Sequence, residues 1–461
     1  MLGCIAMPAQ AEVRRPNVVF ILADDLGYMD IGANNSKTFY ETPHINQLAA
    51  QGVRFTAGYA ACPVCSPTRA SILTGKYPAR LHLTNFIGGG RAGKLKPAPF
   101  VGHLPLEEVT FAEALKAAGY TTGFFGKWHL GGGQFQPENQ GFDIYMGGNG
   151  AGLPSSYFSP YINSMLPDGP KGEYLTDRLT DEAIKFIETN KEKPFVVYIS
   201  HYAVHNPQQA KAKLIDKYTT KAAALPRWTG KEVVPGKQGR QVQNQPVYAA
   251  MIESLDESVG RITQRLSELR LDQNTIVMFM SDNGGLSTSE GSPTSNLPLL
   301  AGKGWLYEGG VREPMIIKVP GVTRAGSLCN TPVISTDFYP TILELAGLPL
   351  KPNQHIDGVS LVPLLKGGEL PQRPLFWHYP HYSNQGGGPC GAVRLGDYKL
   401  IEWYEDEKVE LYHLKDDPGE SNDLAAKMPD KVSALRKLLH DWRESVNATM
   451  PTPNQNENPN K

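Results

Sequence analysis

Short runs of apolar, mostly β-branched residues recur along the chain with almost no polar alternation. They occupy residues 18–23, 121–125, 195–199 and 275–280. Runs of this kind are typical of strands that are buried on both faces of a sheet. The pattern therefore predicts at least four central strands.

Helical patterns separate these runs. The clearest has apolar residues at alternating steps of three and four: Tyr248, Ile252, Leu255, Val259, Ile262, Leu266 and Leu269. Another opens with Thr110 and Glu113, a capping-box pair, and ends at Gly119. Strands that alternate with helices predict an α/β fold, with a large, doubly wound, mostly parallel sheet flanked by helices.

The pattern changes near the C-terminus. Residues 392–412 carry short strand-like runs broken at Gly396-Asp397 and Glu405-Asp406, which are turn-type pairs. An amphipathic helix follows around Leu435, Leu439 and Trp442. We therefore expect a main catalytic unit at 13–365, a smaller C-terminal antiparallel sheet plus helix at 366–450, and a disordered Asn/Pro-rich tail at 451–461.

Composition and charge narrow the class of protein. The 461 residues include 40% hydrophobic and 20% charged residues, as in ordinary globular proteins, and the formal net charge of -1 gives no global attraction to nucleic acid. No run of about 18 apolar residues is present, so we expect no membrane span. Residues 1–12 end in Ala9-Gln10-Ala11, which fits the remnant of a signal peptide and predicts export to the periplasm or the medium.

The five cysteines do not form the framework of a disulfide-rich domain in a chain of this size. If Cys4 is removed with a signal peptide and Cys65 has a chemical role, three remain. They allow at most one disulfide, and buried free thiols are the alternative.

Chemically active side chains follow directly after the predicted strands. Asp24-Asp25, Lys127 with His129, His201 with His205, and Asp282-Asn283 all have this position. The carboxyl ends of parallel strands share one edge of a sheet, where such folds bind ligands. Asp24-Asp25 alone would be an ordinary turn or helix cap, and Asp282-Asn283 alone would be an ordinary turn. Together, three carboxylates and an amide oxygen form a ligand set that suits Ca²⁺ or Mg²⁺ and not zinc.

Cys65 precedes an apolar stretch, and Pro67 stands where the first turn of a helix tolerates proline. This predicts Cys65 at a helix N-terminus, with Arg69 one turn later on the same face. A thiol nucleophile and a buried structural thiol both fit this pattern.

Several motifs resemble those of one enzyme family. Cys65-x-Pro67-x-Arg69 followed by Leu73-Thr74-Gly75 resembles the first signature of the type I, formylglycine-dependent sulfatases of the alkaline-phosphatase-like superfamily. Residues 119–129, ending in Gly126-Lys127-Trp128-His129, are similar to the second signature. Asp24-Asp25, residues 281–284, 302–304 and 396–400 follow in the family's order, so the resemblance covers nearly the whole chain.

This resemblance implies a sulfuric ester hydrolase whose nucleophile is made from Cys65. A maturation enzyme would oxidise Cys65 to Cα-formylglycine, whose hydrated form is a gem-diol. Asp24, Asp25, Asp282, Asn283 and the modified residue 65 would hold a divalent cation, usually Ca²⁺, with Mg²⁺ as the alternative. One hydroxyl would attack sulfur, and the second would expel sulfate. An ordinary serine lacks this second hydroxyl.

The resemblance also implies the catalytic roles of the charged residues. Asp282 would take the proton from the attacking hydroxyl, His129 would drive the elimination, and His205 would protonate the leaving oxygen. Arg69, Lys127 and Lys303 would stabilise the charge on formylglycine and on the sulfate oxygens. The expected substrate contacts therefore include Lys127, His205 and Lys303.

Further substrate contacts are less closely tied to the motifs. His201 fits either substrate contact or a supporting position in the core. One aromatic segment, at 377–382, contains His378 and His381, and Arg394 follows it. These residues fit either a sugar-binding rim or a loop anchored by packed aromatic rings. The first alternative makes a sulfated carbohydrate the expected substrate.

Two other functions remain open at this point. Phosphate or phosphonate monoester hydrolases share the fold, but a phosphatase favours Ser or Thr as the nucleophile and a second, His-rich metal site. An inactive glycan-binding homologue would have degenerate motifs, whereas every motif position is filled here. The oligomeric state and the sulfated position are not indicated by the sequence.

Overall fold

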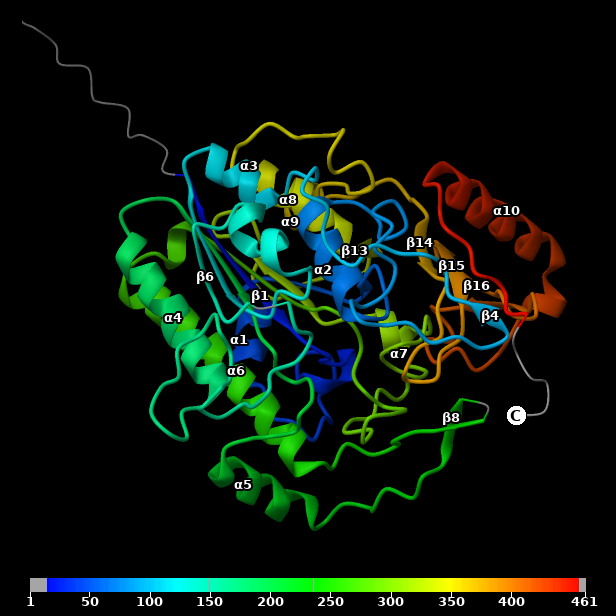
Figure 1. The fold of residues 1–461 in the computed structure, drawn as a ribbon, viewed down its shortest axis with the longest axis horizontal. Coiled ribbons are helices and arrows are strands. Elements are labelled where there is room, and N and C mark those ends of the chain that lie inside the picture. The colour runs from blue at the N-terminus through cyan, green and yellow to red at the C-terminus, as the bar shows by residue number, and fades with distance from the viewer. Residues whose placement is uncertain (1–14, 149, 235, 456–461) are drawn as a thin grey trace, which may run out of the picture.

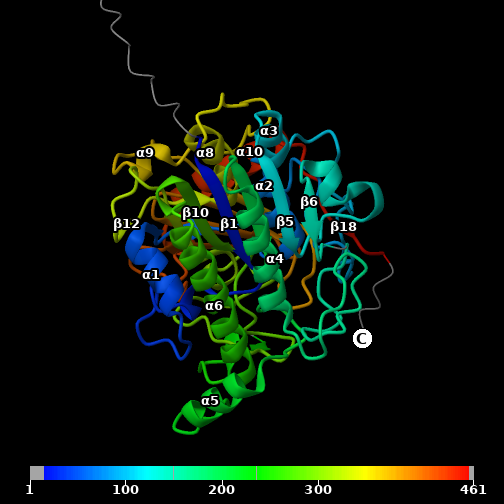
Figure 2. The same cartoon turned by 90° about the vertical axis from the view of Figure 1, so that its left-hand side faces the viewer.

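The computed structural model describes residues 15–148, 150–234 and 236–455. The predicted signal remnant at 1–12 and Cys4 lie outside this part of the chain. A central eight-stranded sheet runs in the order β12, β2, β11, β10, β1, β7, β5, β6 (Figures 1 and 2). Its strands are β1 (Asn17–Ala23), β2 (Val53–Phe55), β5 (Thr121–Gly126), β6 (Ile144–Met146), β7 (Phe195–Ser200), β10 (Thr275–Ser281), β11 (Met315–Lys318) and β12 (Ser327–Cys329).

Strand β11 is antiparallel to both of its neighbours, while the other neighbouring pairs are parallel. The predicted large, mostly parallel sheet is therefore confirmed. The four predicted runs form β10, β1, β7 and β5, which lie next to one another at the centre.

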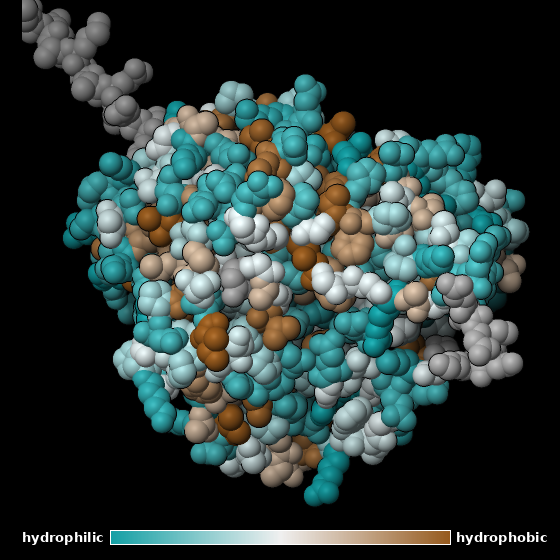
Figure 3. Space-filling model, viewed as in Figure 1, coloured by the Kyte–Doolittle hydropathy of each residue, from teal (hydrophilic) through white to brown (hydrophobic). Residues whose placement is uncertain are grey.

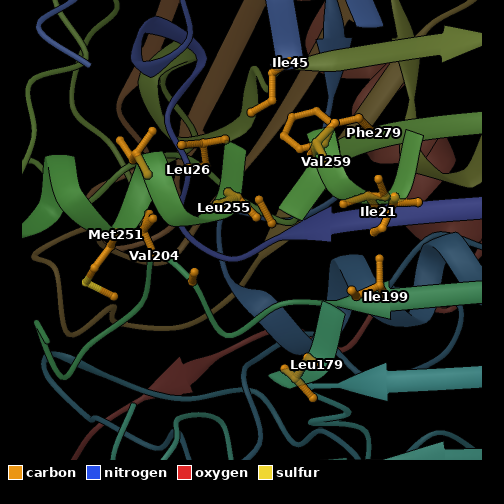
Figure 4. Packing of buried hydrophobic residues seen from close by; sticks show 14 of the residues in the cluster. Ile21, Leu26, Ile45, Leu179, Ile199, Val204, Met251, Leu255, Val259 and Phe279 are labelled. Atoms are coloured by element: carbon orange, nitrogen blue, oxygen red, sulfur yellow. The ribbon is translucent and has the colours of Figure 1, made fainter. Parts of the chain in front are cut away.

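Helices cover both faces of this sheet. One face packs against α1 (Pro43–Gln51), α4 (Leu175–Asn190) and α6 (Pro246–Glu268), and α5 (Ala212–Ala222) packs on α6. Figure 4 shows Leu255 and Val259 of α6 close to Ile21 and Phe279 of the sheet. Each such side chain is fully buried, which contributes about 1.5–3 kcal/mol.

The opposite face carries a second apolar cluster. Because successive strand residues alternate in direction, Val18, Phe20 and Leu22 belong to this cluster while Val19 and Ile21 belong to the first. Its helices are α2 (Cys65–Thr74), α3 (Phe111–Ala117) and α8 (Phe338–Leu345). The capping box at α3 is confirmed, because Glu113 N donates to Thr110 Oγ1 at 3.1 Å and Thr110 N donates to Glu113 Oε2 at 2.7 Å.

A smaller antiparallel sheet forms the C-terminal part, as predicted. It consists of β14 (Leu375–Tyr379), β15 (Cys390–Leu395), β16 (Tyr398–Trp403) and β17 (Val409–His413), and α10 (Pro429–Ser445) covers it (Figure 1). A third apolar cluster joins this sheet to the main unit through residues such as Trp377 and Trp305.

Short elements complete the described chain: β3 (Gly58–Tyr59), β4 (Leu95–Lys96), β8 (Glu232–Val234), β9 (Lys237–Gln238), α7 (Glu308–Val311), β13 (Val333–Ile334), α9 (Val362–Leu365) and β18 (Thr452–Pro453). Strand β18 pairs with β4, so the expectation of disorder from residue 451 onward is wrong for its first residues. The backbone hydrogen bonds of that pair hold them, and residues 456–461 lie outside the described chain.

The described cysteines are all free thiols: Cys62, Cys65 and Cys390 are buried and Cys329 is partly buried. No helix in the described ranges is both long and apolar enough to cross a membrane. The face seen in Figure 3 is mainly hydrophilic, with hydrophobic residues scattered across it.

Candidate active site

The carboxyl ends of β1 and β10 bring three aspartates together. Asp24 and Asp25 follow β1, Asp282 follows β10, and all three are fully buried. The backbone N–H of Asp25 donates to Asp282 Oδ1 at 3.3 Å. Asp25 has a φ of 61°, which is unusual for a residue with a side chain and costs energy that the surrounding contacts must offset.

The same cluster contains features that fit a cation. Ligand atoms of Asp24, Asp25, Cys65 and His205 all lie within 4.8 Å of one another. Asn283 donates through Nδ2 to Asp25 Oδ1 at 2.7 Å, while its buried Oδ1 has no hydrogen-bond partner. An unpartnered amide oxygen beside buried carboxylates suits a hard cation such as Ca²⁺ or Mg²⁺.

Electrostatics lead to the same conclusion. Burial and the neighbouring Asp282 carboxylate raise the pKa of Asp24 to about 7, although Lys127 opposes the shift. Burial also acts to raise the pKa of Asp25, but Lys303 and His205 outweigh it and hold that pKa below its usual range. Concentrated negative charge of this kind is stabilised by a bound cation.

Three buried cations surround the carboxylates. Lys127 Nζ lies 2.6 Å from Asp24 Oδ2, and Lys303 Nζ lies 2.8 Å from Asp25. Arg69 reaches from α2 and contacts Asp282 Oδ2 through both Nε and NH2 at 2.8 Å. Its NH1 donates to Lys127 O at 2.9 Å, so Arg69 links the helix to the ends of two strands. Buried charges are tolerated only when they are paired in this way.

Cys65 is the first residue of α2, as predicted, and its Sγ lies 3.7 Å from Asp24 Oδ1. Burial raises the pKa of the Cys65 thiol to about 12, with partial opposition from Lys127 and Lys303. The unmodified side chain is therefore protonated at neutral pH and is not an activated thiolate. It lines a cavity of about 310 Å³ together with His129, His205 and Lys303.

The two histidines in this cavity are held by backbone carbonyls. His129 Nε2 lies 3.1 Å from Ile87 O, and its Nδ1 has no partner. His205 Nδ1 lies 3.0 Å from Asn206 O, which leaves Nε2 facing Asp25 Oδ2 at 3.6 Å. Burial and then the Lys303 ammonium group lower the pKa of His205 to about 3, and burial and Lys127 hold the pKa of His129 well below its usual value. A bound anion would shift both in the opposite direction.

Four residues predicted to contact substrate are engaged elsewhere, which corrects that part of the prediction. His201 is fully buried and pairs with Ser258 Oγ of α6 at 3.0 Å. His378 lies in β14 and contacts Tyr404 Oη and Thr449 O, both at 2.8 Å. Neither histidine is among the residues that line the cavity.

His381 and Arg394 are also structural. His381 is buried and pairs with Thr84 Oγ1 at 2.8 Å, and Arg394 donates to Gly396 O at 3.0 Å and to the hydroxyl of Tyr59. Trp377, at the start of the predicted rim, donates to Ala60 O at 2.8 Å inside the third apolar cluster. The packed-aromatic alternative therefore describes this segment.

The cavity has other lining residues that the sequence did not indicate: Phe86, Ile87, Gly152, Leu153, Glu290, Asn384 and Gln385. They lie in loops far apart in the chain and carry no strand-end signal. The glycine run that begins at Gly386 is the nearest indication, because loops of this kind often carry binding residues.

The fold and the site together define an α/β enzyme that acts on an anionic group. The sulfatase family model matches residues 16–348, so the chain belongs to the sulfatase family. A second model, N-sulphoglucosamine sulphohydrolase, C-terminal, matches residues 300–446. The protein is accordingly a sulfuric ester hydrolase.

Curated relatives agree over almost the full length. The chain is 31% identical to N-acetylgalactosamine-6-sulfatase of Mus musculus, covering 98% of this chain and 90% of that protein. It is 34% identical to arylsulfatase A of Homo sapiens, covering 93% and 88% respectively.

Solved structures show the same fold. Ps i-CgsB, in complex with k-i-k-neocarrahexaose, superposes with a TM-score of 0.78 at 29% identity and 93% coverage of both chains. The phosphonate monoester hydrolase of Agrobacterium radiobacter superposes with a TM-score of 0.67 at 20% identity, covering 94% of this chain and 96% of that one. That second likeness concerns the fold alone.

Proposed function

We propose that this sulfatase hydrolyses sulfate monoesters of a carbohydrate, with Cα-formylglycine at position 65 and a divalent cation, Ca²⁺ or alternatively Mg²⁺. The observation that carries the proposal is the convergence of ligand atoms of Asp24, Asp25, Cys65 and His205 within 4.8 Å, with Asp282 and Asn283 hydrogen-bonded to Asp25. The names of relatives that act on sugars support the carbohydrate part.

The bound cation and the hydrated aldehyde would supply an activated hydroxyl and a second hydroxyl that releases sulfate. The protein's own residues would do the remaining work. Asp282, fixed by Arg69, would accept the proton of the attacking hydroxyl. Lys127 and Lys303 would offset charge on the sulfate oxygens in a site where water is largely excluded.

We assign the two cavity histidines to opposite ends of the reaction. His205 would donate a proton to the leaving sugar oxygen, with the negative sulfate raising its low pKa. His129 would accept a proton during sulfate release, which is consistent with a neutral imidazole. The proposal also includes a separate maturation enzyme for Cys65 and export of the protein, the latter resting on the Ala9-Gln10-Ala11 pattern.

Metal content and ester preference test this proposal together. Purified enzyme should contain a single calcium or magnesium ion by atomic emission spectrometry, and Asp25→Asn should lose both the ion and the activity. Asp181→Asn, on the exposed face of α4, is the matched control and should retain both. Full activity on sugar sulfates after removal of the ion, or preference for the phosphate ester of the same alcohol, would contradict the proposal.

A further inference from the structure

The active-site cavity is lined by two chemically different kinds of side chain. Phe86, Ile87 and Leu153 are its large apolar members, and 51% of the surface of Leu153 is exposed. Glu290, Asn384 and Gln385 supply the polar side chains. A sugar ring has the same division, because its C–H bonds form an apolar face and its hydroxyls form a polar edge.

Glu290 is the single acidic residue among those that line this cavity. Lys303 also lines the cavity and favours an anion. Two further buried cations lie close to Cys65 and pair with aspartates: Arg69 with Asp282, and Lys127 with Asp24. The exposed Glu290 carboxylate opposes that preference, because it repels any negative group outside the sulfate position.

Two amides fix the Glu290 carboxylate. Gln385 Nε2 donates to Oε1, and Asn206 Nδ2 lies 3.3 Å from Oε2. Gln385 is itself held, because its Oε1 accepts from Ser383 Oγ at 2.6 Å and its carbonyl accepts from Trp305 Nε1 at 3.2 Å. A carboxylate has about four acceptor positions, so each oxygen retains capacity for a hydroxyl donor.

The backbone around Glu290 is also constrained. Glu290, Gly291 and Ser292 have φ values of 54°, 88° and 41°, and two of these residues have side chains that disfavour this region. Such conformations persist where the surrounding structure requires them, often at ligand sites. Asn206 follows His205 directly, so its hydrogen bond ties the carboxylate to the segment that carries the proposed proton donor, and His205 and Glu290 line the same cavity.

We propose that Glu290 is a specificity-determining residue that selects an uncharged sugar unit bearing only the scissile sulfate. It accepts hydrogen bonds from hydroxyls beside the ester and repels a second sulfate or carboxylate on the same sugar unit. This inference rests on the proposed carbohydrate substrate and adds the charge state of the sugar unit that is accepted.

Paired substrates test the inference: a monosulfated neutral sugar, the same sugar with a second sulfate on the adjacent carbon, and an aryl sulfate without hydroxyls. Glu290→Gln removes the charge and keeps the shape, so kcat/KM for the disulfated sugar should rise on the order of tenfold relative to the monosulfated one. Glu290→Ala removes the acceptors too, so kcat/KM for the monosulfated sugar should fall about tenfold. The aryl sulfate should be cleaved equally by all forms.

Glu192→Gln is the matched control, because it makes the same change of charge on an exposed residue just before β7, at the opposite end of that strand from His205. An unchanged ratio of disulfated to monosulfated kcat/KM in Glu290→Gln would overturn the inference. Failure of the carbohydrate proposal would look different, since wild-type enzyme would then cleave the aryl sulfate and neither sugar.

Discussion

A buried charge cluster links the C-terminal sheet to α7 of the main unit, and removing its lysine should destabilise the protein strongly. Lys399 of β16 places Nζ 2.9 Å from Glu308 of α7 and 2.9 Å from Glu420 in the loop after β17. Lys399 and Glu308 are fully buried, and Glu420 is 3% exposed. In Lys399→Met the two carboxylates would lose their common partner.

The magnitude follows from the burial of these groups. Breaking a buried ion pair by removing one partner costs about 3–5 kcal/mol, because an uncompensated charge remains. Burial and the Glu308 charge raise the pKa of Glu420 to about 8, while Lys399 and Arg312 overcome burial and lower the pKa of Glu308. Of the two carboxyls, Glu308 therefore favours its charged form, whereas Glu420 favours its protonated form more than an ordinary glutamate does.

The pH dependence of this loss provides a second test. A carboxyl with a raised folded pKa binds an extra proton in the folded state, so its contribution to stability falls as pH rises from 4.5 towards about 8. In Lys399→Met, burying either carboxyl costs less free energy when that carboxyl is protonated. The loss measured by urea unfolding should therefore be greater at about pH 8 than at about pH 5.5.

Lys437→Met is the matched control. Lys437 Nζ lies 2.5 Å from Asp441 Oδ2, and the two side chains are 75% and 57% exposed. An exposed pair contributes about 0–1 kcal/mol. A loss in Lys399→Met no larger than that of the control, or one that is independent of pH, would refute this account of the interface.

Two further predictions concern the leaving group and α10. His205→Ala should reduce hydrolysis of a sugar sulfate much more than that of a nitrophenyl sulfate, because the sugar alcohol is the poorer leaving group; equal losses in steady-state kcat/KM would exclude proton donation by His205. Glu402 Oε1 accepts from Arg436 and His440, and Arg443 NH2 lies 2.8 Å from its Oε2, so despite burial its pKa is lowered. The stability that the charged Glu402 contributes is complete above pH 4.5 and is lost as pH falls through the lower folded pKa. The free energy of unfolding of Glu402→Gln, measured with urea, should therefore be about 1–3 kcal/mol below wild type at neutral pH and should approach wild type in strong acid. A difference in this free energy that does not change with pH would contradict the prediction.

The sequence indicates the centre of the fold more completely than its edges. The four central strands are continuous apolar runs because both of their faces are buried. Edge strands such as β2 (Val53–Phe55) and β12 (Ser327–Cys329) have three residues each, which is too short for a period to appear. Strand β14 resembles a sugar-binding rim in sequence because its aromatic residues suit sugar binding as well as packing.

The residues of the site also differ in how well the sequence indicates them. Cys65, Lys303 and the strand-end residues stand in motifs, so their positions along the chain are enough to predict that they lie near one another. Glu290 could not be found in this way, because its position depends on Gln385, which lies 95 residues further along the chain. His201 follows a strand as His205 does, but its ring points into the contact with α6.

The most direct test of the central claim compares the state of residue 65 with activity. Samples of the enzyme should be prepared with different extents of maturation, and the tryptic peptide covering residues 55–69 should be analysed by mass spectrometry. Sulfate ester hydrolysis should rise in proportion to the fraction of peptide that carries the aldehyde, and Cys65→Ala should be inactive. Full activity in protein that carries only the thiol at position 65 would contradict the account.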